Sequence, residues 1–469
     1  MTPSFYRSCH DLPPLAGLCS MDEAAKPGLS VAECVRRLKR FHYCFKRLHE
    51  ILTARITSEP IYELKTAFAH HAYWCAEHVA ALRKRIGEMR EPPLGLDDVP
   101  HPALEVLFDE IRAVQKTDHV VYGVYLTAIG TLLTEMADYV RETHPLTDAP
   151  SLRVLKFARI ELEEMYRFGM ASVPKLGDIW PTRDWDQAVI RPLLEAAKWP
   201  ADQCGELPRR YSAQPWTYDP IPRRDERFTD LWNQGVNAEA FLYDETKPPR
   251  AKALMMLFKR LREIDVPEMM ASIITQTKDK PWDYFLAMSR QLWDEARHAM
   301  MGEVGFVALG IDWTKARITW NWSYRLNTEC TPLERHGVLF FIEQGLMPKT
   351  GKRYEFEMAT MSGIPLVSTI QDFDWADEVL HSQIGREWYV SQFDSLKEAM
   401  DFGDRAWSKI TSNWTTVREQ GLTRHENWWP AIYTQYCLAE RLSPDRDVLN
   451  FDVSYDGKRA DIHRKLPME

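Results

Sequence analysis

Apolar residues recur at intervals of three and four along most of the chain, which is the spacing of amphipathic helices. In the first half this spacing predicts long helices at residues 30–56, 60–90, 101–143 and 150–172. In the second half it predicts helices at residues 226–242, 248–278, 282–309, 332–362, 365–395 and 404–420. Alternation with a period of two is scarce, and only residues 316–326 alternate enough to predict a short strand or an extended loop. The pattern therefore predicts a nearly all-α fold.

A segment dense in Pro, Trp and Arg separates the two sets of predicted helices. We expect an ordered connector with one short helix near residues 185–198, because many Trp side chains favour packing over a flexible linker. The predicted organisation is a helical bundle, a connector, a second helical bundle, and a C-terminal helix with an aromatic-rich tail, at residues 1–175, 176–225, 226–400 and 401–469.

The two sets of helices share a local sequence match. FKRLHEI at residues 45–51 resembles FKRLREI at residues 258–264, and each is followed by a turn containing Pro and a second predicted helix. In that second helix, Ala80 falls in register with His298. We therefore predict an internal repeat whose first copy is structural and lacks the candidate site described next.

Two Glu-x-x-His motifs lie 83 residues apart in predicted helices, Glu295 with His298 and Glu378 with His381. Residues three apart project from one face of a helix, so each pair can hold the same metal ion. Glu343 lies on an apolar stripe of another predicted helix, where an unpaired carboxylate would cost several kcal/mol. A dinuclear site in a four-helix bundle needs one Glu from each of two further helices. Glu343 is the predicted ligand from one of them.

The fourth carboxylate is predicted in residues 248–278, where Glu268 and Glu263 are the candidates. Glu268 continues the apolar stripe of this helix, whereas Glu263 shares its face with basic residues, and we favour Glu268 for that reason. Sequence spacing favours Glu263 instead. It lies 32 residues before Glu295, against 27 for Glu268, and the corresponding spacing in the second pair of helices is 35. Pro267 lies between the candidates and is expected to kink the helix, so both stay open.

An Asp precedes each Glu-x-x-His motif, namely Asp294 and Asp377. A metal-bound imidazole usually donates its free N–H to a carboxylate, which fixes the ring's orientation. We expect these two residues to have that role. Arg297 is expected either to hold Asp294 or to form an ordinary surface salt bridge.

Composition excludes several classes of protein. The net charge of −9 and the interspersed charged residues argue against non-specific nucleic-acid binding. The eight Cys residues form no Cys-x-x-Cys pair, which predicts reduced thiols and a cytoplasmic protein. The N-terminus does not have the pattern of a secretory signal, and no run of about eighteen apolar residues predicts a membrane span. The expectation is a cytoplasmic protein with no membrane partner.

Asp-Glu-Ala-Arg-His at residues 294–298 resembles the Asp-Glu-x-Arg-His signature of the ferritin-like superfamily, specifically its dimetal-carboxylate oxidases and oxygenases such as the bacterial multicomponent monooxygenases. The resemblance covers residues 248–395. Together with the repeat, it implies two ferritin-like four-helix bundles in tandem, the second carrying the metal site. It also implies that two metal ions are bound by Glu268, Glu295, His298, Glu343, Glu378 and His381.

The expected function is a non-haem dinuclear oxidoreductase that activates O2 to oxidise a small organic substrate. Hard carboxylate ligands with two imidazoles suit iron first and manganese second, as an Fe/Fe or Mn/Fe pair. An electron donor or carrier protein and a second copy of the chain are compatible partners. The alternatives are a dimetal-carboxylate halogenase, a ferroxidase or metal-storage protein, and a non-catalytic helical scaffold.

Overall fold

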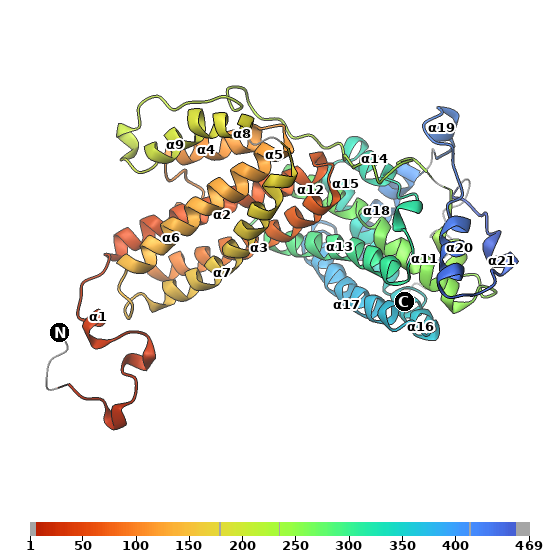
Figure 1. Ribbon diagram of the computed structural model, residues 1–469, viewed down its shortest axis with the longest axis horizontal. Coiled ribbons are helices and arrows are strands. Elements are labelled where there is room, and N and C mark those ends of the chain that lie inside the picture. The colour runs from red at the N-terminus through yellow and green to blue at the C-terminus, as the bar shows by residue number, and fades with distance from the viewer. Residues whose placement is uncertain (1–5, 178–179, 234, 412–413, 456–469) are drawn as a thin grey trace. The chain divides into compact units, whose positions relative to one another are not determined.

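A computed structural model describes residues 6–177, 180–233, 235–411 and 414–455, and every regular element in these ranges is a helix (Figure 1). The absence of strands from the described residues confirms the all-α prediction. The chain divides into two compact units. The first contains residues 1–52 and 71–217, and the second contains residues 53–70 and 218–469. The division differs from the predicted one, because residues 53–70 belong to the second unit and the connector up to residue 217 belongs to the first.

The first unit is built mainly from long helices, and the tips of α2 and α3 belong to the second unit. A continuous helix from Thr117 to Glu142 contains α5, a π-helical stretch at Tyr122–Ile129, and α6. The helices of this part of the chain are α1 (Met21–Ala24), α2 (Val31–Ser58), α3 (Tyr62–Met89), α4 (Pro102–Ala113), α5 (Thr117–Val121), α6 (Gly130–Glu142), α7 (Ala149–Ser172), α8 (Trp180–Trp185) and α9 (Arg191–Ala196).

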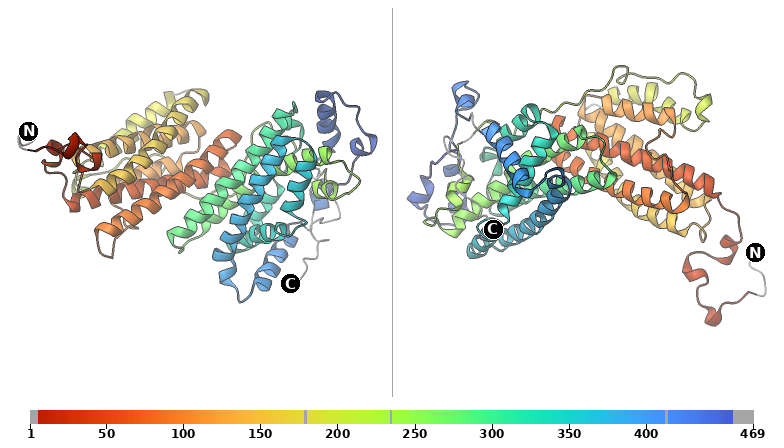
Figure 2. Two further views of the ribbon diagram at one scale, coloured as in Figure 1. Left: turned by 90° about the horizontal axis from the view of Figure 1, so that it is seen from below. Right: turned by 180° about the vertical axis from the view of Figure 1, so that it is seen from behind.

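The second unit contains the remaining helices, among them those that carry the candidate ligands. They are α10 (Ala238–Leu242), α11 (Pro249–Arg262), α12 (Asp265–Gln276), α13 (Trp282–Ala308), α14 (Asn321–Glu329), α15 (Pro332–Leu346), α16 (Lys352–Met361), α17 (Pro365–Trp388), α18 (Leu396–Thr411), α19 (Trp414–Glu419), α20 (Trp429–Ala439) and α21 (Arg446–Leu449). Helix α13 packs against α11, α12 and α17, and α15 packs against α12, α17 and α18. The green helix α13 and the light-blue helix α17 run side by side in both views of Figure 2.

Two glycines of α13 allow a close approach to α11. A Cβ atom at Gly302 would lie 2.3 Å from the backbone nitrogen of Leu261, and one at Gly305 would lie 2.2 Å from the side chain of Leu257. Both distances are far below a van der Waals contact. At Gly302 the neighbouring atoms belong to the backbone of α11, so only Gly fits there, whereas a larger residue at Gly305 would require the Leu257 side chain to move. Because Gly302 lies about one turn after His298, this contact brings the end of α11 close to the Glu-x-x-His motif of α13.

The predicted helix at residues 248–278 is two helices, α11 and α12, separated at Glu263 and Ile264. Pro267 explains the break. It has no N–H to donate to the carbonyl of Glu263 four residues earlier, and its ring would clash with that carbonyl in a continuous helix. Instead, the N–H of Val266 donates to the Glu263 carbonyl at 2.9 Å. Glu263 therefore lies at the end of α11, while Glu268 lies inside α12.

Four other predictions of regular structure are wrong in detail. The predicted helix at 101–143 is interrupted, since α4 ends at Ala113 and the next helix begins at Thr117. Only residues 238–242 of the predicted helix at 226–242 are helical, and residues 321–329 form helix α14 where a strand or loop was predicted at 316–326. These two segments contact each other, since the N–H of Trp320 donates to the carbonyl of Leu231 at 2.8 Å. This long-range hydrogen bond takes the place of a bond within a local element. The predicted helix at 332–362 is divided into α15 and α16 by a turn before Lys352.

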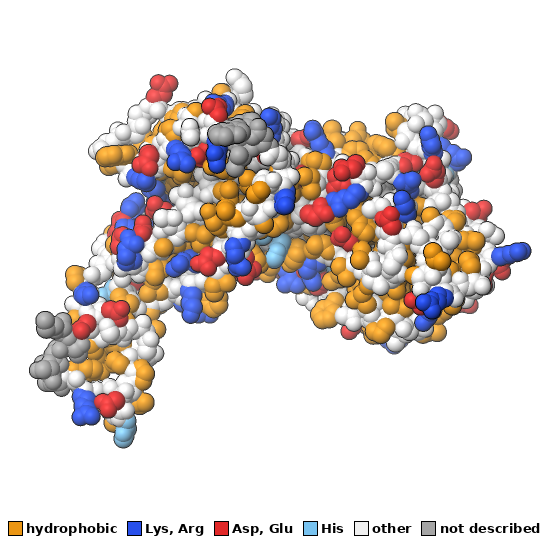
Figure 3. Space-filling model, viewed as in Figure 1, with side chains coloured by type: hydrophobic (Ala, Val, Ile, Leu, Met, Phe, Trp, Pro, Cys, Tyr) orange, Lys and Arg blue, Asp and Glu red, His pale blue; other side chains and the backbone are white. Residues whose placement is uncertain are grey.

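One described helix, Thr117–Glu142, has the length and apolar composition that could span a membrane, and 56% of its most apolar window is buried inside the protein. A buried core helix of a soluble protein passes the same test, so this is weak evidence for a span. On the face shown in Figure 3, acidic and basic side chains are interspersed, as the composition indicates.

Candidate metal centre

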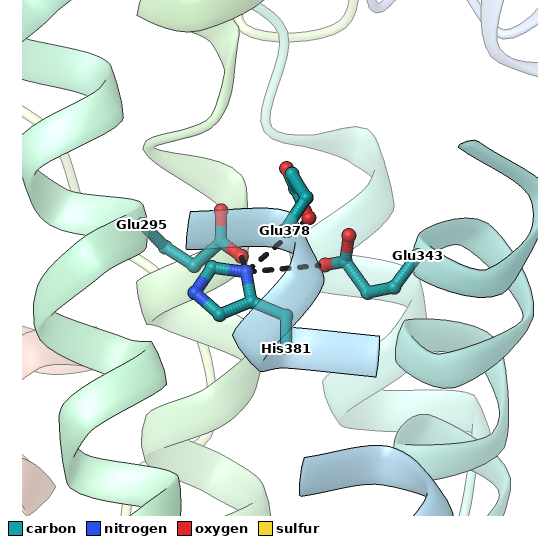
Figure 4. Close-up of side chains that lie close together, drawn as sticks. All are labelled: Glu295, Glu343, Glu378 and His381. Carbon is teal, nitrogen blue, oxygen red and sulfur yellow. Dashed lines mark hydrogen bonds and ion pairs between the residues drawn. The ribbon is translucent and has the colours of Figure 1, made fainter. Parts of the chain in front are cut away.

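Three carboxylates and one imidazole converge inside the second unit, from helices α13, α15 and α17 (Figure 4). The Nδ1 atom of His381 lies 3.1 Å from Glu295 Oε1, 3.3 Å from Glu378 Oε2 and 4.0 Å from Glu343 Oε1. All four side chains are buried, and one ligand atom from each lies within 4.8 Å of the others. This first group could hold a metal ion.

A second group surrounds His298. Its Nδ1 atom lies 3.4 Å from Glu263 Oε2, 3.5 Å from Glu295 Oε2 and 3.6 Å from Asp374 Oδ1. Glu295 belongs to this group and to the first one, and Glu378 belongs to the first group and to a third set with His298 and Asp374. The shared carboxylates therefore connect two neighbouring positions that could each hold a cation.

The donor atoms fit metal ions in two respects. Glu263 Oε2, Glu295 Oε1 and His298 Nδ1 are buried and make no hydrogen bond with any described residue, which is costly unless another group satisfies them. The donors are carboxylate oxygens and imidazole nitrogens, which suit divalent iron or manganese. The residues present therefore fit a pair of such ions.

Five of the six ligands predicted from the sequence are brought together, namely Glu295, His298, Glu343, Glu378 and His381. Glu268 is not among them, and this preference is corrected. Its carboxylate lies 2.7 Å from Lys65 Nζ and 2.9 Å from Arg224 Nη2, and all three side chains are buried. The two cations satisfy Glu268 and lower its pKa, although burial alone would raise it. Glu263, the alternative that the sequence left open, faces His298 instead.

The aspartates that precede the two motifs bind the imidazoles crosswise. Asp377, on α17, lies 3.2 Å from the Nε2 atom of His298 on α13, and Asp294, on α13, lies 3.4 Å from the Nε2 atom of His381 on α17. Arg297 forms ion pairs with both aspartates. Each imidazole is therefore bound at its Nε2 atom by an aspartate of the other helix, and its Nδ1 atom faces the carboxylates of the two groups.

Three charged residues that the sequence analysis did not select also face the centre. The Nζ atom of Lys352 lies 2.9 Å from both carboxylate oxygens of Asp374 and 2.8 Å from Glu378 Oε1, and Arg260 pairs with Asp374 and Glu263. Asp374 could have been found from its spacing, since it lies four residues before Glu378 on the same face of α17. Lys352 and Arg260 carry no comparable signal.

Both imidazoles have raised pKa values. Burial alone would lower the pKa of His298, but the surrounding carboxylates, Asp377 foremost, outweigh burial and raise it to about 10. The pKa of His381 is also well above its usual value, since Asp294 and other carboxylates outweigh burial. Without a metal, both rings are therefore protonated at neutral pH. A metal ion must displace these protons to bind.

The pKa values of two neighbouring carboxyl groups, Glu343 and Glu378, are shifted in opposite directions. Burial, followed by the charge of Glu378, raises the pKa of Glu343 well above its usual value. Burial acts in the same sense on Glu378, but the Lys352 ammonium outweighs it and holds the pKa of Glu378 well below its usual value. In the absence of metal, Glu343 therefore holds a proton that Glu378 does not.

Lys352→Met is expected to destabilise the metal-free protein by about 3–5 kcal/mol, because it leaves Asp374 and Glu378 without the buried ammonium between them. In protein loaded with manganese the loss should be smaller, since the metal supplies positive charge to the same carboxylates. Urea unfolding with and without a chelator measures both values. Lys349→Met, which removes an exposed lysine three residues earlier, is the matched control. Equal losses in the two conditions would contradict the expectation.

Comparison with known proteins gives no relative for this chain: no family model, no curated protein and no solved structure matches it.

Proposed function

We propose that the second unit binds two metal ions and uses them to activate O2 for the oxidation of a small organic substrate. The observation that carries the proposal is the pair of overlapping buried groups, each with one imidazole, linked through Glu295 and Glu378. A lone Glu-x-x-His motif is weak evidence, but two that converge from adjacent helices on shared carboxylates make the arrangement expected for a dinuclear carboxylate site.

Each position has its own set of residues in this proposal. Glu263 and His298 would hold one ion, Glu343 and His381 would hold the other, and Glu295 would be available to both. Iron is the first choice and manganese the second, because most of the donors are hard oxygen atoms. When bound, such a pair supplies electrons to O2 and a strong oxidant for the substrate.

The protein's own residues would position and insulate this chemistry. The two imidazole rings donate crosswise hydrogen bonds from their Nε2 atoms to Asp294 and Asp377, which fixes the rings so that their Nδ1 atoms face the other carboxylates. Lys352 and Arg260 place buried positive charge on Asp374. These contacts limit rearrangement of the ligands while a substrate binds.

A cavity of about 420 Å³ favours an organic substrate over metal storage. Glu263, Glu295, Glu343 and Glu378 contribute to its lining, so the space reaches the candidate ligands directly. A ferroxidase needs only a path for ions, whereas an oxygenase needs a chamber beside the metals for its substrate. A dimetal halogenase would need the same chamber and differs in the group it transfers.

We also propose that the two units are a tandem pair of ferritin-like bundles, with an electron donor or carrier protein serving the second. The sequence match supports this proposal, with FKRLHEI at residues 45–51 within α2 and FKRLREI at residues 258–264 across the end of α11. In this proposal the first unit has a structural role.

The proposal is tested by metal analysis of protein grown with iron and manganese. Plasma mass spectrometry should find about two such ions per chain in the wild type and almost none in Glu295→Ala/His298→Ala. Circular dichroism should stay helical, and O2 uptake by the chemically reduced protein should be lost with the metal. Glu77→Ala, which removes an exposed carboxylate of the first unit, should change neither property. Equal metal content in wild type and double variant would refute the assignment and favour a non-catalytic scaffold.

A further inference from the structure

The cavity beside the candidate metal centre is formed by residues of the second unit alone. Its volume of about 420 Å³ lies within the range of small-molecule binding sites, about 300–1,000 Å³. Because part of its wall consists of the candidate ligands, a molecule inside it would lie next to the metal ions. The remaining walls therefore indicate what kind of molecule fits.

Most of these walls are apolar. Met400 and Trp407 face the cavity from α18, where their spacing of seven places them on one side of the helix. Leu339 and Ile342 face it from α15, and Trp322 faces it from α14. Two indole rings and several aliphatic side chains suit an aromatic or aliphatic body, which would lose its water on entering.

Apart from the candidate ligands Glu263 and Glu295, the wall contains a carboxyl group with one oxygen that has no hydrogen-bond partner among the described residues. Asp265 lines the cavity and is 4% exposed. Arg224 and the hydroxyl of Ser323 both donate to its Oδ1 atom, the latter at 3.0 Å. Its Oδ2 atom is buried and accepts no hydrogen bond from any described residue. A buried carboxyl oxygen without a hydrogen-bond partner is costly, and a ligand in the cavity can supply a donor.

The charged residues that line the cavity also indicate which charge the ligand should carry. Its basic residues are already ion-paired, in the pairs Lys259–Glu355, Arg260–Glu263 and Arg262–Glu239. The lining includes two further carboxylates, Asp401 and Asp404, and Asp401 is its most exposed member among the described residues. An anionic ligand would meet these carboxylates without a basic side chain to receive it, whereas a cation would be attracted.

We propose that the cavity binds an apolar amine, whose N–H group donates to the free oxygen of Asp265 while its hydrocarbon body lies between the walls of α14, α15 and α18. This inference rests on the proposed function in one respect, namely that the bound amine is the substrate to be oxidised. The preference for an amine can be measured without any reaction.

Tryptamine and indole-3-propionate are suitable probes, because they share an indole ring and a short side chain and differ in the charge at its end. Isothermal titration is carried out on the full chain with excess zinc, a redox-inert ion that occupies the carboxylate ligands. Tryptamine is expected to bind at least about tenfold more tightly than indole-3-propionate. Asp265→Asn should weaken tryptamine binding about 10- to 100-fold and should not weaken binding of the propionate.

Two further variants control for misfolding and for binding elsewhere. Asp372→Asn removes an exposed carboxylate of α17 outside the cavity and should leave tryptamine binding unchanged. Leu339→Trp places a larger side chain in the cavity and should abolish binding of tryptamine. This variant tests the binding site independently if Asp265→Asn fails to fold. Equal affinity for the two probes, or tryptamine binding that survives Leu339→Trp, would overturn the proposal. Amine binding without metal or O2 uptake would instead refute the proposed function and uphold this one.

Discussion

Glu263→Ala is expected to remove about half of the bound metal, whereas Glu268→Ala is expected to leave the metal and lower the free energy of unfolding by about 3–5 kcal/mol. The two glutamates lie five residues apart and are both largely removed from solvent, but their surroundings differ. Glu263 Oε2 faces His298 and accepts no hydrogen bond from any residue that the structure describes. Glu268 has Lys65 and Arg224 as ion-pair partners.

The loss of stability in Glu268→Ala follows from the two buried basic side chains that the variant leaves without this carboxylate. Lys65 and Arg224 would stay buried with a large part of their negative partner removed, and breaking a buried ion pair in this way is strongly destabilising. Glu263→Ala removes a ligand from one metal position, while Arg260 keeps its pair with Asp374. Its main effect should therefore fall on metal content.

Metal analysis and urea unfolding of the two variants, each with and without a chelator, measure both expectations. Glu268→Gln is the matched control, since it keeps the shape and one acceptor oxygen and should retain metal. If Glu268→Ala lost metal while its unfolding free energy in the chelator stayed at the wild-type value, Glu268 would be the ligand that the sequence first favoured. Retention of all metal by Glu263→Ala would exclude Glu263 as a ligand.

The metal-free protein is expected to lose several kcal/mol of stability as the pH rises from 6.5 to about 10, and the metal-loaded protein is not. His298 has an ordinary pKa of 6.5 when unfolded and about 10 in the folded chain. A raised folded pKa gives stability that is fully present below 6.5 and is lost as the pH rises through 10. A pKa difference of one corresponds to about 1.4 kcal/mol. His381 and Glu343, whose pKa values are also raised, act in the same direction.

Bound metal should reverse this dependence. Metal ions displace the protons of the two imidazoles and of Glu343, so apparent metal affinity should rise with pH and binding should release protons. Thermal unfolding across this pH range, in chelator and in manganese, measures both slopes. Titration in buffers of different ionisation enthalpy counts the protons released. In Glu295→Ala/His298→Ala the fall in stability of the chelated protein should be smaller, and a slope equal to that of the wild type would contradict the assignment.

The helices that carry the site were largely predictable, because their side chains repeat at helical intervals over long stretches. The failures have specific causes. Residues 316–326 alternate like a strand, but residues 321–329 are helical and Trp320 bonds to a distant segment. The length of the predicted helix at 248–278 was wrong because the missing N–H of Pro267 ends α11 before α12 begins. Local pattern could locate Pro267 but not the residue at which the helix would break.

Spacing along the chain was sufficient to place two Glu-x-x-His pairs on helices and to show that Glu343 needs a partner. The difference between Glu263 and Glu268, in contrast, became visible only in the folded chain. The choice depends on where α11 ends and on Lys65, which approaches Glu268 from α3, about 200 residues earlier in the sequence. The crosswise pairing of Asp294 and Asp377, and the contact of Lys352 with Glu378, were likewise decided by how helices pack, which no local spacing records.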